Sequence, residues 1–308
     1  MPAAEHTHNP FSGALLDRRG ADRAIAGWPE RVRADPAARF VLSSGTRHLV
    51  RREPLPSIAF LEASDPIVRG ANPGDFVLLG QHQGAPCVLL DLPAEPNQLP
   101  PATAFEELRP LLGVLGGAEA VILTCARSLA IWRARQLHCG VCGSPTEPRQ
   151  AGHVLRCTSS ACGADFFPRI DPAVIVIVDD GRQALLGRQA SWPKGRYSAL
   201  AGFVEPGESL EDAVAREVAE ETGIRITEAH YFASQPWPFP GSIMVGFHAQ
   251  ARHGAVRLDD ELEDARWFSA EEIAAAPAAL LPAPYTIARR LIDAWYQKVT
   301  GRALTVLA

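Results

Sequence analysis

The sequence lacks any apolar run long enough to cross a bilayer. Its longest uncharged apolar run covers residues 173–178, whereas a transmembrane helix needs about 20 such residues. The N-terminus, MPAAEHTHNPFSG, has no basic region followed by an apolar core, which a secretory signal peptide requires. These absences predict a cytoplasmic protein without a membrane partner.

A strong charge of either sign is also missing. The formal net charge is −5 over 308 residues, so the chain as a whole does not attract nucleic acid, and any nucleotide contact must come from a local patch or a metal. No internal repeat and no low-complexity segment is visible. The hydrophobic content of 47% is ordinary for a globular chain with room for two or three domains.

Hydrophobic patterning divides the chain into three parts. Alternating segments at 39–51, 57–64 and 75–92 predict strands of a small β-rich domain, and a proline-rich break leads to helices expected at 105–115 and 118–137. After a cysteine-rich segment, a hairpin at 171–189, a helix at 210–222, two strands and a helix at 284–299 predict a sheet with helices on its faces. We expect an N-terminal β-rich domain with connecting helices (1–136), a zinc ribbon (137–167) and a catalytic domain (168–308).

Four of the six cysteines are grouped in pairs. CGVC (Cys139, Cys142) is followed by CTSSAC (Cys157, Cys162) across a segment that is turn-like and then strand-like. In a reducing compartment this grouping favours metal over disulfides, and four thiolates on a short ribbon suit a closed, structural Zn²⁺ site. The second spacing is looser than the commonest zinc knuckle. The alternative is four free, buried cysteines.

Basic side chains surround the cysteine quartet. They are Arg133, Arg135, His138, Arg149, His153, Arg156 and Arg169. A local basic patch on an acidic protein would hold a polyanionic strand irrespective of its sequence. An ordinary solvated face, whose arginines pair with nearby carboxylates, explains the same residues equally well.

The stretch SQPWPFP, residues 234–240, places three prolines beside two large aromatic side chains. Proline fixes φ and removes a backbone donor, so this run is expected to be a rigid loop outside any helix or sheet interior. Its rings would serve either as a lid on the core or as a wall for a planar ligand.

The helix at 210–222 carries three glutamates on one side. At about 100° per residue, Glu217, Glu220 and Glu221 fall within one arc that continues the apolar stripe of the helix. Carboxylates crowded near a core repel one another unless a cation neutralises them. Oxygen ligands without Cys or His select a hard ion, Mg²⁺ or Mn²⁺. The alternative is a charged surface helix.

Residues 202–224 resemble a known family. Gly202, Glu208, and the run from Arg216 to Ile224 match the Nudix box at every defined position. The box implies an α/β sandwich Nudix fold, of the α+β class, and metal-dependent hydrolysis of nucleoside diphosphates linked to another group. SQPWPFP followed by Ser242, with a four-cysteine ribbon before the catalytic domain, resembles the NADH pyrophosphatase subfamily.

The resemblance also implies a reaction and a site. The reaction is cleavage of NADH or NAD⁺ to nicotinamide mononucleotide and AMP, and some relatives remove NAD caps from RNA 5′ ends. Glu217, Glu220, Glu221 and Glu261 would hold the catalytic metal, with Glu221 or Glu261 as the base. Substrate would be bound by Phe167 and Phe203, which stack on the nicotinamide, and by Gln235, Trp237, Ser242 and Ala288. Family members form homodimers. For either Phe, burial in the core is the alternative.

Two other functions are compatible with these motifs. One is a broad ADP-ribose or nucleoside-diphosphate-sugar pyrophosphatase, because the box does not specify the linked group. The other is a regulator that keeps the fold and binds nucleotides or RNA without catalysis, although every box glutamate is present.

Overall fold

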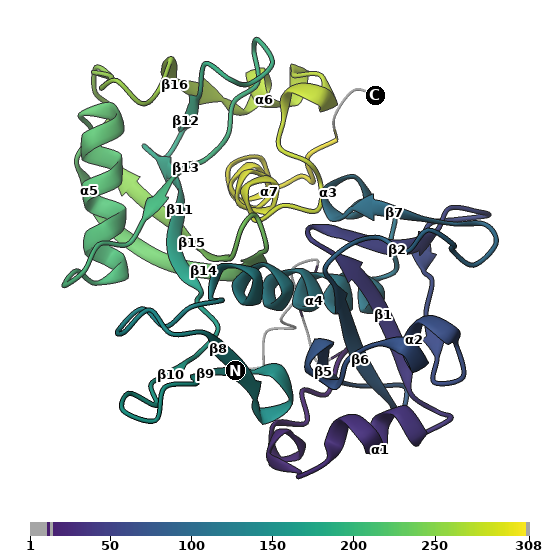
Figure 1. Ribbon diagram of the computed structural model, residues 1–308. Helices are drawn as coiled ribbons and strands as arrows, with labels where there is room; N and C mark the ends of the chain where they lie inside the picture. Colours follow the sequence, from purple (N-terminus) through teal and green to yellow (C-terminus); the bar gives the residue numbers. More distant parts are fainter. Residues whose placement is uncertain (1–10, 13–14, 306–308) are drawn as a thin grey trace, which may run out of the picture. The chain divides into compact units, whose positions relative to one another are not determined.

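The computed structural model describes residues 11–12 and 15–305, and these form two compact units (Figure 1). The N-terminal unit contains the described residues up to Ile170 together with the segment Trp237–Gly241. The C-terminal unit contains residues 171–236 and the described residues from Ser242 onward. Each unit has its own sheet and its own core.

The sheet of the N-terminal unit has seven strands in the order β3-β2-β1-β6-β5, with β4 paired to β1 and β7 paired to β2. Strands β1 and β6 run parallel, while β1 and β2 are antiparallel. Its strands are β1 (Arg39–Ser44), β2 (Arg47–Arg51), β3 (Ser57–Ile58), β4 (Leu61–Glu62), β5 (Phe76–His82), β6 (Ala85–Leu92) and β7 (Thr103–Glu107).

Helices cover this sheet. Val32 of α1 (Trp28–Ala34) and Val68 of α2 (Pro66–Gly70) pack with Phe40 and Phe76 in one core cluster. Helix α4 (Gly117–Arg135) packs against β1 and β5. Short 3-10 turns lie at Gly20–Ala24 and Pro73–Asp75.

The helix expected at 105–115 is wrong in its first part. Residues Thr103–Glu107 form β7, and Phe105 lies opposite Leu49 of β2 with 2% of its surface exposed. Only Leu108–Leu111 are helical (α3). Burial of Phe105 in the sheet core outweighs the local preference for a helix.

The cysteine-rich segment forms a separate three-stranded ribbon within the N-terminal unit. Its order is β10 (Asp165–Phe166), β9 (Val154–Cys157) and β8 (Thr146–Arg149). A 3-10 turn at Gln150–Gly152 connects β8 to β9. The two outer strands flank β9, which ends at one of the four cysteines.

The C-terminal unit is a mixed six-stranded sheet between helices. Its order is β14-β15-β11-β12-β16, with β13 paired to β11, and β11 and β15 run parallel. Figure 1 shows α5 on one face and α7 on the other. Its elements are β11 (Asp171–Asp179), β12 (Gln183–Arg188), β13 (Leu200–Phe203), α5 (Leu210–Thr222), β14 (Ile226–Trp237), β15 (Ser242–Ala251), β16 (Asp264–Ser269), α6 (Ala270–Ala275), a 3-10 turn at Ala278–Leu280 and α7 (Ile287–Thr300).

Strand β11 supplies both cores of this unit. Val174, Val176 and Val178 pack on the α5 side, whereas Ile175 and Ile177 pack with α7. A strand covered on both faces reads as a continuous apolar run, which explains the sequence from Ala173 to Val178. The sheet with helices on its faces, expected from the sequence for this part of the chain, is the fold observed.

The two sheets repeat one topology, although the sequence showed no repeat. In the N-terminal sheet, β1 pairs with β6, β4 and β2, and β2 also pairs with β7. In the C-terminal sheet, β11 pairs in the same way with β15, β13 and β12, and β12 also pairs with β16. Helix α2 stands between the corresponding strands as α5 does.

The proline-rich stretch is only partly a loop. Strand β14 extends through Ser234 and Pro236 to Trp237, so the expectation that the whole run lies outside the sheet is wrong. Strand β14 is at the edge of the sheet, where the missing N–H of a proline costs no ladder bond.

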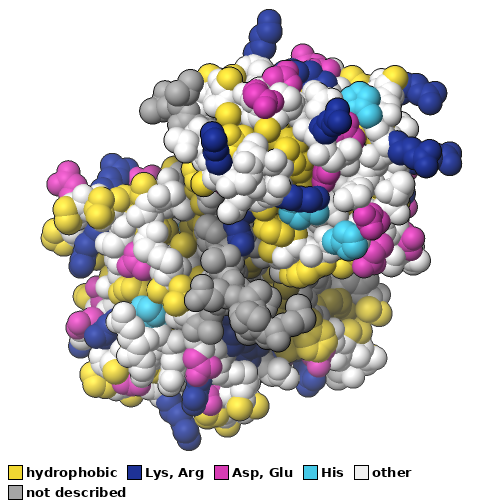
Figure 2. All heavy atoms as spheres, turned by 180° about the vertical axis from the view of Figure 1, so that it is seen from behind, with side chains coloured by type: hydrophobic (Ala, Val, Ile, Leu, Met, Phe, Trp, Pro, Cys, Tyr) yellow, Lys and Arg dark blue, Asp and Glu magenta, His cyan; other side chains and the backbone are white. Residues whose placement is uncertain are grey.

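The described surface and helices show neither a single-sign charged face in Figure 2 nor a membrane-spanning helix. On the face seen in Figure 2, basic and acidic side chains are interspersed. Within the described part of the chain, no helix combines the length and the apolar character needed to cross a membrane.

Candidate active site

Helix α5 is fixed at both ends by its own sequence. Ser209 caps the N-terminus in a capping box with Asp212, and Gly223 ends the helix with a φ of 71°. The reciprocal Ser and Asp bonds satisfy otherwise unpaired N–H groups, and glycine adopts the left-handed conformation without strain. The rotation of the helix, and therefore the direction of its glutamates, is set by burial of Val214 and Val218.

Two of the three glutamates turn inward. Glu217 is 8% exposed and Glu221 is 3% exposed, whereas Glu220 is an exposed residue. Glutamate side chains are rarely buried to this degree unless they are paired. Helix α5 is therefore not an ordinary charged surface helix, and its carboxylates enter the protein where β13 ends.

Gly202 of β13 makes room for Glu217. A Cβ at Gly202 would lie 1.9 Å from the Cδ of Glu217 and 2.0 Å from its Oε1. The carboxylate therefore lies directly against the backbone of β13. The glycine is required by this close approach and not by its φ angle.

Arg216 ties the acidic groups together. Its Nη1 donates to Glu217 Oε1 at 2.9 Å and to Glu220 Oε2 at 3.0 Å. Its Nε and Nη2 donate to both carboxylate oxygens of Glu208 at 3.0 and 2.6 Å, and Nη2 also donates to the carbonyl of Phe203 at 2.9 Å. A planar guanidinium can hold these three carboxylates and one carbonyl in a fixed arrangement, so Arg216 holds the loop after β13 to α5.

The electrostatics of the site favour a cation. Burial, followed by repulsion from Glu217, Glu261 and Asp259, raises the pKa of Glu221 to about 8. Burial also raises the pKa of Glu217. The Oε2 atom of Glu221 is buried and has no hydrogen-bond partner. A buried, unpaired carboxylate oxygen among further carboxylates suits a hard divalent ion.

The sequence did not single out Asp259. It lies in the acidic run DDELED, two residues before Glu261, and its carboxylate accepts a hydrogen bond from the Glu261 backbone N–H at 2.9 Å. The density of acidic residues in this run was the available signal. Glu261 itself is exposed, and repulsion from its charge contributes to the raised pKa values of Glu217 and Glu221.

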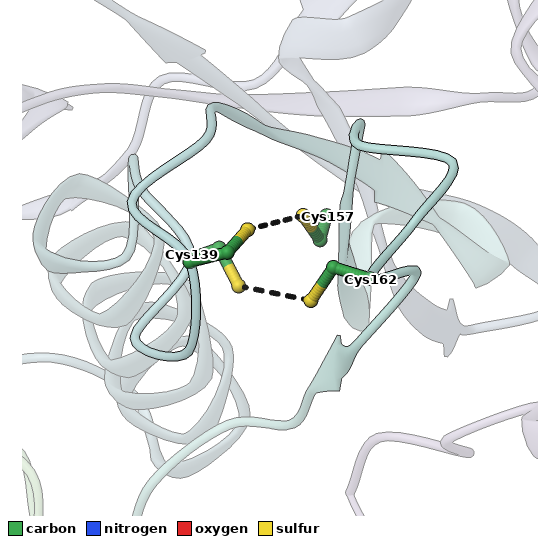
Figure 3. Close-up of side chains that lie close together, drawn as sticks. Cys139, Cys157 and Cys162 are labelled. Carbon is green, nitrogen blue, oxygen red and sulfur yellow. Dashed lines mark hydrogen bonds between the residues drawn. The ribbon is translucent and has the colours of Figure 1, made fainter.

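The cysteine quartet has the geometry of a tetrahedral metal site. The Sγ atoms of Cys139, Cys142, Cys157 and Cys162 all lie within 4.8 Å of one another. The Cys139–Cys162 separation is 3.7 Å and the Cys142–Cys157 separation is 3.4 Å. Four sulfurs at about 2.3 Å from one Zn²⁺ would be about 3.8 Å apart, so the set fits zinc. Figure 3 shows Cys139, Cys157 and Cys162 pointing toward one another.

The quartet differs from the glutamate site in how tightly its ligands are grouped. Among the residues that the structure describes, only the cysteines bring three or more candidate ligand atoms within 4.8 Å of one another. Hydrogen bonds from Ser144 lower the pKa of Cys142 to about 6, which favours the thiolate that zinc binds. The glutamate oxygens lie farther apart, an arrangement compatible with an ion that keeps several waters, as Mg²⁺ does.

Three models of known families match consecutive segments. Residues 37–132 match an NADH pyrophosphatase-like rudimentary NUDIX domain, residues 134–167 match an NADH pyrophosphatase zinc ribbon domain, and residues 169–291 match a NUDIX domain. The NAD-capped RNA hydrolase NudC of Stutzerimonas stutzeri is 40% identical over 232 residues, which cover 74% of this chain and 80% of that protein. The protein of the same name from Mycobacterium bovis is 37% identical over 310 residues, which cover 91% of this chain and 94% of that protein.

This chain belongs to the Nudix hydrolase family. A crystal structure of a NUDIX hydrolase from Nitrosomonas europaea is 20% identical, with a TM-score of 0.45, and covers 55% of this chain and 96% of that one. In this Nudix hydrolase the match to a rudimentary domain agrees with the duplicated sheet. Where the C-terminal unit has Glu217, Glu220 and Glu221 on helix α5, the N-terminal unit has the five-residue helix α2 without glutamate.

The two phenylalanines expected to bind substrate are surface residues of this Nudix hydrolase. Phe167 is 65% exposed in the N-terminal unit, and Phe203 is 59% exposed in the C-terminal unit. Large aromatic rings are usually buried, so burial in the core does not explain either residue. Phe203 follows Gly202 at the end of β13, beside the buried Glu217.

Gln235 has a structural contact that the sequence did not indicate. It is fully buried, its side-chain amide donates to the carbonyl of Tyr285 at 2.8 Å, and its Oε1 accepts from the backbone N–H of Ile287 at 2.8 Å. The amide therefore ties β14 to the first turn of α7. Ser242, at the start of β15, is 9% exposed, and Ala288 of α7 is 7% exposed.

Four of the seven basic residues around the cysteines bond to nearby groups in this Nudix hydrolase. Arg149 pairs with Glu147, and Arg156 makes two 2.7 Å bonds to Asp165. His153 is buried and bonds to the carbonyl of Leu78. Arg133 donates to the carbonyl of Gly74 at 2.6 Å. Pairing with nearby groups, the alternative weighed for these residues, describes them better.

Proposed function

We propose that this chain hydrolyses the pyrophosphate bond of NADH or NAD⁺, producing nicotinamide mononucleotide and AMP. The observation that carries the proposal is the pair of buried carboxylates, Glu217 and Glu221, packed at the end of β13 with one carboxylate oxygen unpaired. The substrate class comes from the relatives, whose names describe hydrolysis of NAD-capped RNA. Removal of NAD caps from RNA 5′ ends is part of the same proposal, because both substrates contain one scissile bond.

Mg²⁺ or Mn²⁺ would be held by Glu217, Glu220, Glu221 and Glu261. When bound, such an ion polarises a phosphoryl oxygen and lowers the pKa of water. Arg216 holds Glu217 and Glu220 in place, and Gly202 lets Glu217 lie against β13. The quartet Cys139, Cys142, Cys157 and Cys162 would hold a structural Zn²⁺.

The chain's own side chains supply the base and the substrate contacts. Glu221 and Glu261 are the two candidates for the base that accepts a proton from water. The exposed rings of Phe167 and Phe203 would stack on the nicotinamide. Gln235, Trp237, Ser242 and Ala288 would be further substrate contacts.

The organisation of the whole protein follows from the same proposal. Residues 1–136 would form the N-terminal domain, 137–167 the zinc ribbon and 168–308 the catalytic domain. We propose a homodimer that acts in the cytoplasm, whose reducing conditions keep four thiolates available for zinc.

The decisive experiment incubates purified protein with NADH and Mn²⁺ and measures AMP and nicotinamide mononucleotide. We expect both products in equal amounts, and a loss of about 100-fold or more in turnover for Glu220→Gln, which removes a ligand charge without changing shape. Absence of AMP across metals and pH would instead support the nucleotide-binding regulator.

A comparison of substrates separates this function from a broad ADP-ribose pyrophosphatase. Phe203→Ala should reduce kcat/KM for NADH about tenfold, since a stacked ring contributes roughly 1–3 kcal/mol, and should leave the ADP-ribose value nearly unchanged. Equal losses of kcat/KM on both substrates would show that Phe203 does not act by stacking on the nicotinamide. Turnover of free NAD⁺ and of NAD-capped RNA, measured side by side, ranks the two substrates.

A further inference from the structure

The tip of the proline-rich stretch belongs to the N-terminal unit. Residues Trp237–Gly241 leave the C-terminal sheet between β14 and β15 and pack with the N-terminal unit. The Phe239 N–H donates to the carbonyl of Trp237 at 2.8 Å, and the two rings meet edge to face with centroids 5.3 Å apart. The tip is therefore a compact aromatic turn, defined here as the Trp237–Gly241 turn.

Arg127 of α4 holds the backbone of this turn. Its side chain is 9% exposed, and its Nε donates to the carbonyl of Pro238 at 2.9 Å. Its Nη1 donates to the carbonyl of Thr46 and, at 3.1 Å, to Glu107 Oε2. The Thr46 hydroxyl donates to the other oxygen of Glu107 at 2.6 Å. The guanidinium is thus fixed by two segments of the N-terminal sheet while it binds the turn.

Two guanidinium groups also hold the rings of the turn. The Cζ atom of Arg127 lies 5.1 Å from the centroid of Phe239, and that of Arg109 lies 4.3 Å from the same ring. Arg109 also lies 5.5 Å from the ring of Trp237. Arginine over an aromatic face contributes roughly 0.5–2 kcal/mol, so each ring has a specific partner.

The turn is not surrounded by apolar core. Phe239 and Pro240 border a hollow of about 450 Å³, which is also lined by Thr46, Ile131 and Arg135. With open space on one side, packing alone does not fix the position of the turn. The hydrogen bond to Pro238 and the cation–π contacts are the interactions that specify it.

We propose that Arg127 is a positioning residue for Trp237: by holding the Trp237–Gly241 turn, the rudimentary domain fixes the ring that the proposed function makes a substrate contact. This inference rests on the proposed function for its substrate. It assigns the N-terminal unit a part in substrate selection, performed by an arginine that does not touch substrate. Arg109 also contacts the Phe239 ring of this turn.

The test compares Arg127→Met with Arg69→Met in the full-length protein. Arg69 is an exposed arginine of α2 in the same unit, and it makes a matched control for the loss of one charge. Hydrogen exchange of the segment 234–244 is measured together with the kinetics of NADH hydrolysis. In Arg127→Met we expect exchange of this segment to increase at least tenfold, with exchange in β11 unchanged, because one charge-assisted bond contributes about 1.5–3 kcal/mol.

In the same variant, KM for NADH should rise about tenfold, the factor that 1.4 kcal/mol produces, while kcat stays within a factor of two. Arg127→Lys, which keeps the charge, should recover part of the KM. Unchanged exchange in 234–244, or a fall in kcat without a change in KM, would overturn the assignment. If the unaltered protein does not hydrolyse NADH, the proposed function fails, and the exchange measurement still tests whether Arg127 holds the turn.

Discussion

At the scale of single residues, Gly202 leaves no room for a side chain. Alanine would place a Cβ 1.9 Å from the Glu217 carboxyl carbon, so the carboxylate must move. We expect Gly202→Ala to stay folded, because overpacking costs roughly 1–3 kcal/mol, but to bind Mn²⁺ about 10- to 100-fold more weakly, as displaced groups around metal ligands do.

Calorimetric titration with Mn²⁺ measures this effect. Gly116→Ala is the control, since it adds a methyl group where no atom lies within 4 Å. Wild-type Mn²⁺ affinity in Gly202→Ala would show that Mn²⁺ binding does not depend on the position of Glu217 against β13.

Glu221 makes the stability of the metal-free protein depend on pH. Its pKa is about 8 in the folded protein, well above the ordinary glutamate value of about 4.5. Between these values the folded state keeps a proton that the unfolded chain has lost, so the free energy of unfolding falls as pH rises, by at most about 1.4 kcal/mol per pH unit. Metal competes with this proton, and stabilisation by Mn²⁺ should therefore be larger at pH 8 than at pH 6.

Melting temperatures in EDTA and in Mn²⁺, measured from pH 5 to pH 8, check both trends. Glu221→Gln carries no titrating group at this position and should flatten both curves. If the variant retained the wild-type pH dependence, another group would be responsible.

At the scale of elements, helix α5 was predictable because every local signal agrees. Ser209 and Asp212 cap its start, Gly223 ends it, and Val214 and Val218 define its buried side. The sequence therefore predicted both the helix bounds and the direction of Glu217. The contact of Glu217 with Gly202 was not predictable, because it depends on how closely β13 approaches α5 in the folded protein.

Other elements depended on partners that the sequence does not reveal. Phe105 looked helical and is a strand residue because Leu49 of β2 pairs with it. Arg127 looked like one of several arginines on a helix, and its role depends on a turn 111 residues away in the sequence. Tertiary contacts determine the structure at these residues, and local propensity does not predict those contacts.

The zinc ribbon gives a prediction at this scale. Cys142→Ser should lower the zinc content below one ion per chain and lower the melting temperature, because binding of a structural zinc is coupled to folding of the ribbon. Elemental analysis and calorimetry measure the two effects. Cys87→Ser is the comparison, since Cys87 is a buried cysteine of β6 outside the quartet. Full zinc content in Cys142→Ser would remove this thiol from the ligand set.

At the scale of the whole molecule, the duplicated topology was hidden from the sequence. Corresponding strands share their pairing partners but not their residues, as β4 (Leu61–Glu62) and β13 (Leu200–Phe203) show. Strand pairing is carried by backbone hydrogen bonds, so the topology can persist while side chains change. The sequence reveals motifs such as the glutamate helix more readily than it reveals shared architecture.

The proposed homodimer is tested on the intact protein. Sedimentation equilibrium should give twice the mass of one 33.2 kDa chain. If each pocket borrows residues from its partner, specific activity should fall on dilution below the dimer dissociation constant. A monomeric mass with full activity at every concentration would contradict this arrangement.

The lack of glutamate in helix α2 has a consequence for stoichiometry. Two copies of one architecture do not make two sites, because the helix of the first copy carries no carboxylate that could hold a metal ion. Titration with a slowly released inhibitor should therefore reach its end point at one equivalent per polypeptide.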